Sequence, residues 1–458
     1  MTPSTLDINN EEILDNIKYL LENKQTELVL NILADLHSAD IAEMLERLEN
    51  EYRGPILALL DQETASEVLT ELDESIREDV LEVLDSSRIA ELVNEMDSDD
   101  AADVVSVLSN ERATEVLSQV EDEYSEDIQE LMHYPEDSAG GIMAKEFVAV
   151  NADNTVEEAI NELRSKREEV EEIYQCYAID DFGKLVGSVS LKELILAKPY
   201  NLIRHIMDED VFAIRSDMDQ EEVARIFEKY DLVSAPVVNT KHQLIGRITI
   251  DDVVDVIQEE AEEDITRIAG IGEEEILEES VWPIVKARIP WLLIAFFGEI
   301  VSAWVMQLHQ MTIDQILAAA FFVPLVMAMG GSTGQQSSII VVRGLSTGEI
   351  NPRDIRRRLT RELRASLVNG LIIAAMIFSI VIFWFKDLSF AIILSGTLLI
   401  VILNASIFGA MVPFGFKKID VDPANATGPL IATFNDVVGL LIYFGLMTLA
   451  LRYTLIGG

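Results

Sequence analysis

The chain has 458 residues, too many for one ordinary domain, and its charge is distributed unevenly. Residues 1–280 hold 72 acidic and 21 basic side chains, a net charge of −51, whereas residues 281–458 hold 9 and 13, a net charge of +4. Such acidity argues against a nucleic-acid partner, whose phosphates need Lys and Arg, and it suits hard divalent cations, which prefer carboxylate oxygens. Most of these acids individually form a solvated surface.

Further features of the composition limit the function. Cys176 is the only cysteine, which excludes disulfides within the chain and Cys-rich zinc sites. The sequence shows no nucleophile–base pairing and no phosphate-binding loop, so we expect a protein that is not an enzyme. The first residues, MTPSTLDINNEEIL, lack the basic start and apolar core of a signal peptide, and we therefore expect the acidic region to remain in the cytoplasm.

Residues from about 10 to 140 carry an internal repeat, in which a pair of adjacent apolar residues recurs every 12 positions. The pairs are Met44-Leu45, Ile56-Leu57, Val68-Leu69, Val80-Leu81, Leu92-Val93, Val104-Val105 and Val116-Leu117. Each unit predicts a short amphipathic helix that ends in a polar turn, and two such helices make a hairpin. Stacked hairpins bury a continuous core, so we predict an all-α helical-repeat domain over residues 1–140.

One acidic stretch within the repeat, MDSDDAAD at residues 96–103, is a candidate cation site. Asp99 and Asp103 lie at positions i and i+4 of a predicted helix, where two like charges repel unless a cation lies between them. The alternative for Asp97 and Asp99 is a helix N-terminus, where Asp is favoured as a cap and by the helix dipole. Asp103 lies too far into the helix for that explanation.

Residues from about 142 to 262 contain a second duplication. The segment FVAVNADNTVEE at 147–158 reappears as VFAIRSDMDQEE at 211–222, and each half predicts strand, helix, strand, turn, strand and helix. The pair resembles tandem CBS domains, which we place at residues 141–258. In that family a Gly-x-x-Ser/Thr-x-x-Asp pattern holds a nucleotide ribose, which implies that Gly246, Thr249 and Asp252 bind a nucleotide such as ATP. The first copy ends in Glu193 instead, and many such modules bind no nucleotide.

Residues 253–277 predict a long acidic helix that leads toward the apolar region, within a connecting segment at 259–280. Its acids crowd two turns and repel one another unless cations screen them; the alternative is a charged linker helix. These acids are Glu259, Glu260, Glu262, Glu263 and Asp264.

Residues 281–458 hold segments long enough to cross a bilayer, whose hydrocarbon core takes about 20 residues of helix. We predict five spans, roughly at residues 289–309, 316–342, 365–385, 388–415 and 427–451. Basic residues gather between spans two and three and between spans four and five, and such loops face the cytoplasm. We therefore expect a multi-pass protein of the cell membrane, in contact with its lipid, with a cytoplasmic N-terminus and an external C-terminus.

Asp436 lies inside the fifth apolar segment, where a carboxylate is costly unless it faces a protein interior or a water-filled path. The alternatives are a carboxylate that reaches the membrane interface or one that is paired with an Arg. The ion pathway is favoured, because the segment between Lys418 and Arg452 contains no Lys or Arg.

Two other features interrupt the apolar spans. The run MGGSTGQQSS at 329–338 predicts a helix that lines a pore or packs closely on a neighbour; packing alone explains Gly330, Gly331 and Gly334 but does not need the Gln and Ser residues together. Glu299, midway along the first span, is a second acid in the membrane. It is protonated, paired at an interface or a secondary ion contact.

The order of these parts, with two motifs, resembles the MgtE family of magnesium channels over almost the whole chain. The motifs are Pro-x-x-x-x-Met-Gly-Gly within 324–350 and Asp-Pro-Ala…Asn-Asp-Val-x-Gly-Leu-Leu-Ile-Tyr-Phe within 422–444. The resemblance implies a five-helix transmembrane domain at 281–458 and a homodimeric, Mg²⁺-selective channel lined by the second and fifth spans. Asp436 would hold a hydrated Mg²⁺ with the carbonyl of Ala432 one turn below, and cytosolic Mg²⁺ would close the path.

The same resemblance implies which acids sense cytosolic Mg²⁺. They are Asp99 and Asp103 in the helical repeat, Asp219, Glu221, Asp231, Asp251, Asp252 and Asp255 in the CBS pair, and Glu263 and Asp264 in the connecting helix. Ser332 departs from the family, whose second-span motif usually reads Gly-Gly-Asn.

Two other functions compete with a Mg²⁺ channel. The first is a secondary transporter of another divalent ion, such as Co²⁺ or Mn²⁺, with Asp436 coupled to protons. The second is a membrane-anchored sensor that uses its CBS modules to bind a nucleotide or a partner; the polar run of the second span speaks against it.

Overall fold

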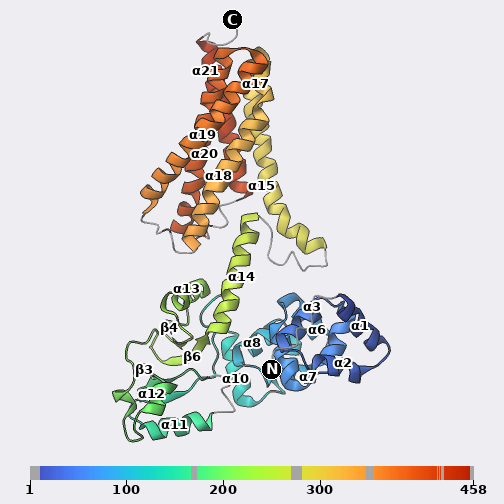
Figure 1. Cartoon of the computed structure of the whole chain (residues 1–458), viewed down its shortest axis with the longest axis vertical. Helices are drawn as coiled ribbons and strands as arrows, with labels where there is room; N and C mark the ends of the chain where they lie inside the picture. The colour runs from blue at the N-terminus through green and yellow to red at the C-terminus, as the bar shows by residue number, and fades with distance from the viewer. Residues whose placement is uncertain are drawn as a thin grey trace. The chain divides into compact units, whose positions relative to one another are not determined.

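The computed structural model describes residues 11–166, 173–269, 281–346, 350, 354–419, 421, 423 and 428–453. The chain forms two compact units, Met1–Gln258 and Glu259–Gly458 (Figure 1). Helix α14 (Ile250–Ala269) begins in the first unit and continues into the second.

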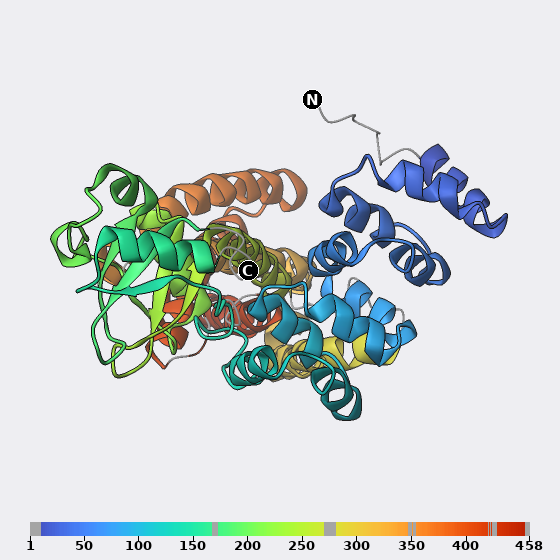
Figure 2. The same cartoon turned by 90° about the horizontal axis from the view of Figure 1, so that it is seen from below.

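The first part of unit one is a stack of short helices. They are α1 (Glu11–Glu22), α2 (Thr26–Leu33), α3 (Ser38–Glu46), α4 (Asn50–Leu57), α5 (Gln62–Glu71), α6 (Glu74–Val83), α7 (Ser86–Val93), α8 (Ser98–Ser106), α9 (Asn110–Leu117) and α10 (Asp122–Leu131). Helices two apart in sequence pack together, for example α3 on α5 and α5 on α7. Figure 2 shows the blue-to-teal helices following one another along a curved stack.

The predicted repeat is confirmed by its core. Every residue of the seven apolar pairs is buried except Leu117, which is partly buried against the same cluster. The repeat also places arginines where they close helix ends: Arg53 Nε donates hydrogen bonds to the carbonyls of Leu45 and Leu48, at 3.1 and 3.0 Å. Arg77, 24 residues later, donates through its Nη2 atom to the carbonyls of Thr70 and Leu72. These bonds satisfy carbonyls that a helix C-terminus leaves without partners.

Two three-stranded sheets follow, one in each half of the second duplication. The first half is β1 (Ala149–Asn151), α11 (Val156–Ser165), β2 (Gln175–Ile179), β3 (Leu185–Ser190) and α12 (Leu191–Leu196). The second is β4 (Ile214–Arg215), α13 (Gln220–Tyr230), β5 (Ser234–Val238), β6 (Leu244–Thr249) and α14. In each sheet the first strand pairs in parallel with the second, which pairs antiparallel with the third. The predicted order of elements is therefore confirmed in both halves.

Gly187 and Gly246, at equivalent positions of the two halves, each lie against the backbone of another segment. A Cβ atom at Gly246 would lie 2.8 Å from the carbonyl oxygen of Ala144, and one at Gly187 would lie 2.8 Å from that of Asp208. Each glycine thus lets a neighbouring segment pair with the third strand, as the bridges Ala144↔Arg247 and Ser188↔Asp208 show.

The second unit contains the apolar helices. They are α15 (Val281–Leu308), α16 (Gln310–Gln315), α17 (Leu317–Phe321), α18 (Val323–Ser346), α19 (Ile355–Phe385), α20 (Leu388–Lys418) and α21 (Pro429–Arg452). Helix α18 packs on α20 and α21, α19 packs on α20, and α15 packs on α21 (Figure 1). Within the described residues, α15, α19, α20 and α21 are long and apolar enough to cross a membrane.

The second predicted span differs from the prediction in two ways. Residues 316–342 form α17 and α18 rather than one helix, with the break at Phe322. Pro324 favours a helix start here, because proline lacks an N–H and is preferred in the first turn of a helix. Helix α18 is not among the described helices that are apolar enough to cross a membrane, because the Gly, Ser, Thr and Gln residues of its polar run lower its mean hydropathy. Helix α19 begins ten residues before the predicted 365, at Ile355.

Candidate functional site

Asp436 is the eighth of the 24 residues of α21, at a point where α15 and α18 also approach. A Cβ atom added to Gly331 of α18 would lie 3.8 Å from the Asp436 Oδ1 atom and 3.9 Å from the Ala432 Cβ atom. The glycine therefore brings α18 against the predicted ion-binding turn. The carbonyl of Ala432 lies in regular helix, where it accepts the backbone N–H of Asp436. Ser332, the departure from the family motif, is exposed on α18.

Glu299 of α15 is the carboxyl group that approaches Asp436 most directly. The two carboxyl groups are within hydrogen-bonding reach of each other. The helices meet one residue earlier as well, because a Cβ atom at Gly298 would overlap the Thr433 side chain. The sequence prediction found Glu299 in the membrane but did not place it beside Asp436.

Asn435 is a residue of this region that the sequence prediction missed. Its side chain is 2% exposed, and in the described structure neither its Nδ2 nor its Oδ1 atom has a hydrogen-bond partner. It packs against Gly334, where a Cβ atom would overlap the amide. Gly409 of α20 in turn packs on the Gly334 backbone. The signal in the sequence was an amide next to Asp436 in an otherwise apolar segment.

The last two residues of the polar run, Ser337 and Ser338, are buried inside the helix bundle. Ser337 is 1% exposed and donates a hydrogen bond to Glu362 of α19, at 2.7 Å between Oγ and Oε1. Ser406 of α20 lies 3.1 Å from the Ser337 hydroxyl. Arg358 pairs with Glu362 at 3.0 Å, and both side chains are largely buried. These serines therefore join α18 to its neighbours.

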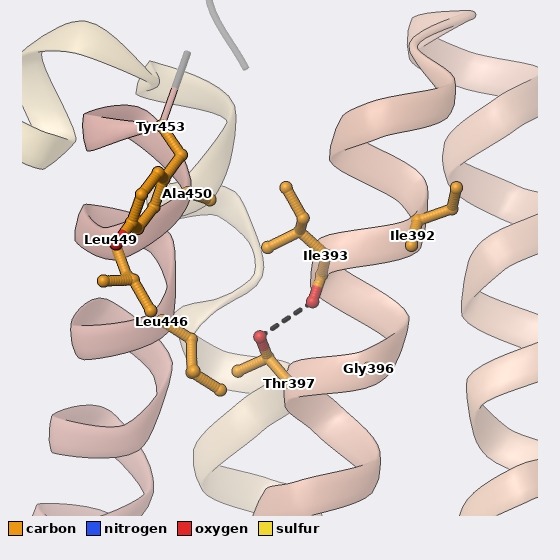
Figure 3. Close-up of a pocket in the computed structure, with 8 residues that line it drawn as sticks. All are labelled: Ile392, Ile393, Gly396, Thr397, Leu446, Leu449, Ala450 and Tyr453. Atoms are coloured by element: carbon orange, nitrogen blue, oxygen red, sulfur yellow. Dashed lines mark hydrogen bonds between the residues drawn. The ribbon is translucent and has the colours of Figure 1, made fainter. Parts of the chain in front are cut away.

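A separate groove lies farther along α20 and α21 (Figure 3). It has a volume of about 230 Å³, and its hydroxyl at Thr397 donates to the carbonyl of Ile393, at 2.7 Å. Apart from this hydroxyl and that of Tyr453, apolar side chains line the groove. Its lining residues are Ile392, Ile393, Gly396, Thr397, Leu446, Leu449, Ala450 and Tyr453.

The acids of the helical repeat meet the second CBS half within unit one. Asp99 is 9% exposed, and its burial and the nearby carboxylate of Asp252 raise the pKa of Asp99 well above its usual range. Burial also raises the pKa of Asp252 to about 6. Asp97 pairs with Arg247 of β6 at 3.6 Å across the same contact. Two carboxyl groups held together in this way are suited to a cation.

Asp103 has different surroundings from Asp99. It is exposed on α8, and the charged groups that act on it are Arg77, Glu136 and Glu74 rather than Asp252. The two acids of the predicted pair therefore share a helix but not a set of neighbours.

The predicted sensor acids of the CBS pair lie mainly at helix ends. Asp219 caps α13 by accepting the backbone N–H of Glu221 at 3.0 Å. Glu221 pairs with Arg225 at 2.9 Å. Asp231 ends α13 in the left-handed conformation, at φ 52°. Asp251 and Asp255 are exposed on α14.

The connecting helix holds the last two predicted acids. Glu263 forms an ion pair with Arg267, one turn later in α14. The side chain of Asp264 lies outside the described residues. Among the side chains that the structure does describe, no group of three His, Cys, Asp or Glu residues could hold a metal ion together.

The predicted nucleotide residues bond to each other. The Asp252 carboxylate accepts hydrogen bonds from the Thr249 hydroxyl at 2.8 Å and from its backbone N–H at 3.0 Å. Asp252, the third residue of α14, thus accepts hydrogen bonds from Thr249, the residue before the helix, as an acid does in a capping box. A ribose would have to share these groups.

Comparison with known families covers most of the chain. Residues 323–446 match the family described as MgtE, divalent cation transporter. Residues 36–137 match the MgtE intracellular N domain, and residues 139–200 and 203–259 each match the CBS domain.

Individual relatives agree with these matches. The chain is 36% identical to the magnesium transporter MgtE of Thermus thermophilus over 328 residues, which are 71% of this chain and 73% of the relative. It is 36% identical to the magnesium transporter MgtE of Bacillus subtilis over 321 residues, 70% of this chain and 71% of the relative. A crystal structure of the cytosolic domain of the Mg²⁺ channel MgtE in complex with ATP is 34% identical; it covers 53% of this chain and 99% of that one, with a TM-score of 0.50.

Proposed function

Because the chain belongs to the MgtE family of magnesium transporters, we propose that it is a Mg²⁺-selective channel whose ion path passes Asp436. It is a non-enzymatic, multi-pass membrane protein with cytosolic N-terminal domains. Beyond membership of the family, we propose an ion path along Asp436, a homodimer and closure of the path by cytosolic Mg²⁺.

The observation that carries the proposal is the position of Asp436. The carboxylate lies two turns into a membrane helix, half-buried, with Gly331 of α18 at its side. Glu299 beside it is exposed on the surface of the single chain. Acids at this depth do not face lipid, so this surface lines a water-filled path or is covered by protein. A second copy of the chain supplies both, which supports a homodimer with the pore between the copies.

A lone carboxylate from each copy suits Mg²⁺. The ion gives up its water reluctantly and usually keeps several waters in protein sites. A narrow ring of carboxylates that contacts the hydrated ion selects it by charge and size.

Transport by the purified full chain in liposomes tests the path. We expect uptake of Mg²⁺, followed by an indicator inside the vesicles, and its loss in Asp436→Asn. Asp314→Asn, which removes an exposed acid of the same unit, is the matched control and retains uptake. Uptake that Asp436→Asn leaves intact would remove Asp436 from the path. Co²⁺ and Mn²⁺ with varied proton gradients test the alternative, a proton-coupled transporter of those ions.

We also propose that cytosolic Mg²⁺ closes the channel through the acids of unit one and α14. The electrostatic effect of Asp252 on Asp99 supports this, because two neighbouring carboxylates repel when free and can be held together by a cation that binds both. Glu263 and Asp264 of α14 belong to the same proposed set of sensor acids.

ATP is the nucleotide that the CBS pair would bind. The relative crystallised with ATP supports this, and so does the presence of Thr249 and Asp252 at the motif positions. Calorimetry of ATP with the full chain tests it: Thr249→Val should abolish binding, and heat that is equal for both proteins would place the nucleotide elsewhere.

A further inference from the structure

The surroundings of Asp436 contain more negative charge than a single carboxylate supplies. Glu299 reaches Asp436 from α15, and the two carboxyl groups are within hydrogen-bonding reach. Among the described residues, Glu299 is the charged side chain that acts on Asp436, and no basic side chain does so. The sequence has no Lys or Arg between Arg288 and Arg343, nor between Lys418 and Arg452.

Two ionised carboxylates do not remain in contact without a positive partner. At about 4 Å, two unit charges repel by roughly 4 kcal/mol even at an effective dielectric constant of about 20. The contact therefore needs a shared proton or a cation. A path for divalent cations supplies the cation whenever the channel conducts.

The packing of α15 on α21 places Glu299 next to Asp436. Gly298, the residue before Glu299, lies directly against Thr433, where any larger side chain would overlap. Gly331 closes the other side of Asp436. The two acids thus project from rigid, glycine-fitted helices rather than from loops.

A second observation on α15 indicates a polar ligand nearby. Ser302 lies three residues after Glu299, which places it on the same side of the helix. Its side chain is 2% exposed, and its hydroxyl has no hydrogen-bond partner in the described structure. A buried hydroxyl in a membrane protein is costly without a partner, and a water molecule held by a hydrated cation would provide one.

We infer that Glu299 is a second carboxylate of the cation site, so that each chain presents Glu299 and Asp436 together to the transported divalent ion. The inference rests on the proposed function, which by itself needs Asp436 alone. Paired in this way across a homodimer, four carboxylates would face one hydrated ion. The added charge raises the affinity for a divalent ion and favours it over monovalent ones.

Mg²⁺ uptake by liposomes that contain the full chain tests the inference. Glu299→Gln keeps the size of the side chain and removes its charge, and we expect the half-saturating Mg²⁺ concentration to rise about tenfold. Glu299→Asp keeps the charge and should bind Mg²⁺ more tightly than Glu299→Gln, whereas Asp314→Asn, which removes an acid outside the site, should stay within about threefold of the wild type. All variants are first checked for unchanged size-exclusion profiles.

The outcomes separate the two proposals. If Glu299→Gln and the wild type have the same half-saturating Mg²⁺ concentration, Glu299 has no role in the cation site, and the channel proposal still stands. This is the result expected if Glu299 and Asp436 share only a proton. Wild-type vesicles that take up no Mg²⁺ overturn both. If Glu299→Gln fails to assemble, Glu299→Ala with added acetate replaces it: restored Mg²⁺ dependence on acetate supports the site, and no change with acetate overturns it.

Discussion

The Ser337 hydroxyl of α18 donates a hydrogen bond to the Glu362 carboxylate of α19, at 2.7 Å. The same carboxylate pairs with Arg358, and Ser366 of α19 bonds to Ser406 of α20 beside it. Three helices are therefore joined by one polar cluster at the end of the polar run. Because α18 also contacts the Asp436 turn through Gly331, this cluster holds the helix that flanks the proposed ion path.

Replacement of Glu362 by Ala should destabilise the membrane unit strongly. The change leaves a largely buried guanidinium without its carboxylate, which costs about 3 kcal/mol. Thermal unfolding of the full chain in detergent, followed by size exclusion, measures the loss. Glu43→Ala breaks the exposed Arg47–Glu43 pair and is the matched control, with an expected cost of about 0.5 kcal/mol or less. Equal melting curves for the two variants would contradict the structural role of the cluster.

The glycines of the membrane unit should differ sharply in tolerance to alanine. Gly334→Ala would force its methyl group into the Asn435 amide, and such overpacking costs about 1–3 kcal/mol. Gly396 of α20 has no atom within 4 Å of an added Cβ, so Gly396→Ala should be neutral or stabilise by up to about 1 kcal/mol. The same thermal assay compares them. A Gly396→Ala variant that unfolds as early as Gly334→Ala would contradict the packing explanation, because helix propensity alone would stabilise both variants.

Periodic patterns in the sequence predicted most of the fold. The 12-residue spacing of apolar pairs identified the helical stack, and the duplicated segments identified two equal halves whose strands pair in the same way. Both follow from burial alone, since a repeated apolar position must face a repeated core. Boundaries were less accurate: α19 starts ten residues before the predicted span because its basic first turns are also good helix formers.

The sequence singles out Asp436 and Glu299 separately, each as an acid in a membrane helix, but it does not predict that they lie together. Their contact depends on how α15 rotates against α21. That rotation is set by the fit of Gly298 to Thr433, which no local pattern encodes. The burial of Asn435 and the inward direction of Ser337 depend on packing in the same way.

Mg²⁺ should stabilise the contact between the helical repeat and the second CBS half. A cation that binds the folded contact and not the open one adds stability that grows with its concentration. We expect Asp99→Asn to shift the Mg²⁺ concentration that half-protects the full chain from limited proteolysis upward by about tenfold. Asp40→Asn, at the start of α3 in the same repeat, is the matched control and should leave the midpoint unchanged. Protection that is equally Mg²⁺-dependent in Asp99→Asn would exclude Asp99 from the sensor.

Cys176 should be unreactive in the folded protein. Its side chain is fully buried in β2, and that burial, with a smaller effect of Glu162, raises the pKa of the thiol from 9.0 to about 12. The reactive thiolate is therefore about a thousandfold scarcer than in the unfolded chain at pH 8, before loss of access is counted. The raised pKa contributes stability that is full below pH 9 and is lost as the pH rises toward 12. Labelling by a maleimide in native buffer and in guanidinium measures the ratio of the two rates. Similar rates in both would mean that the first CBS half opens readily, because this is the only cysteine in the chain.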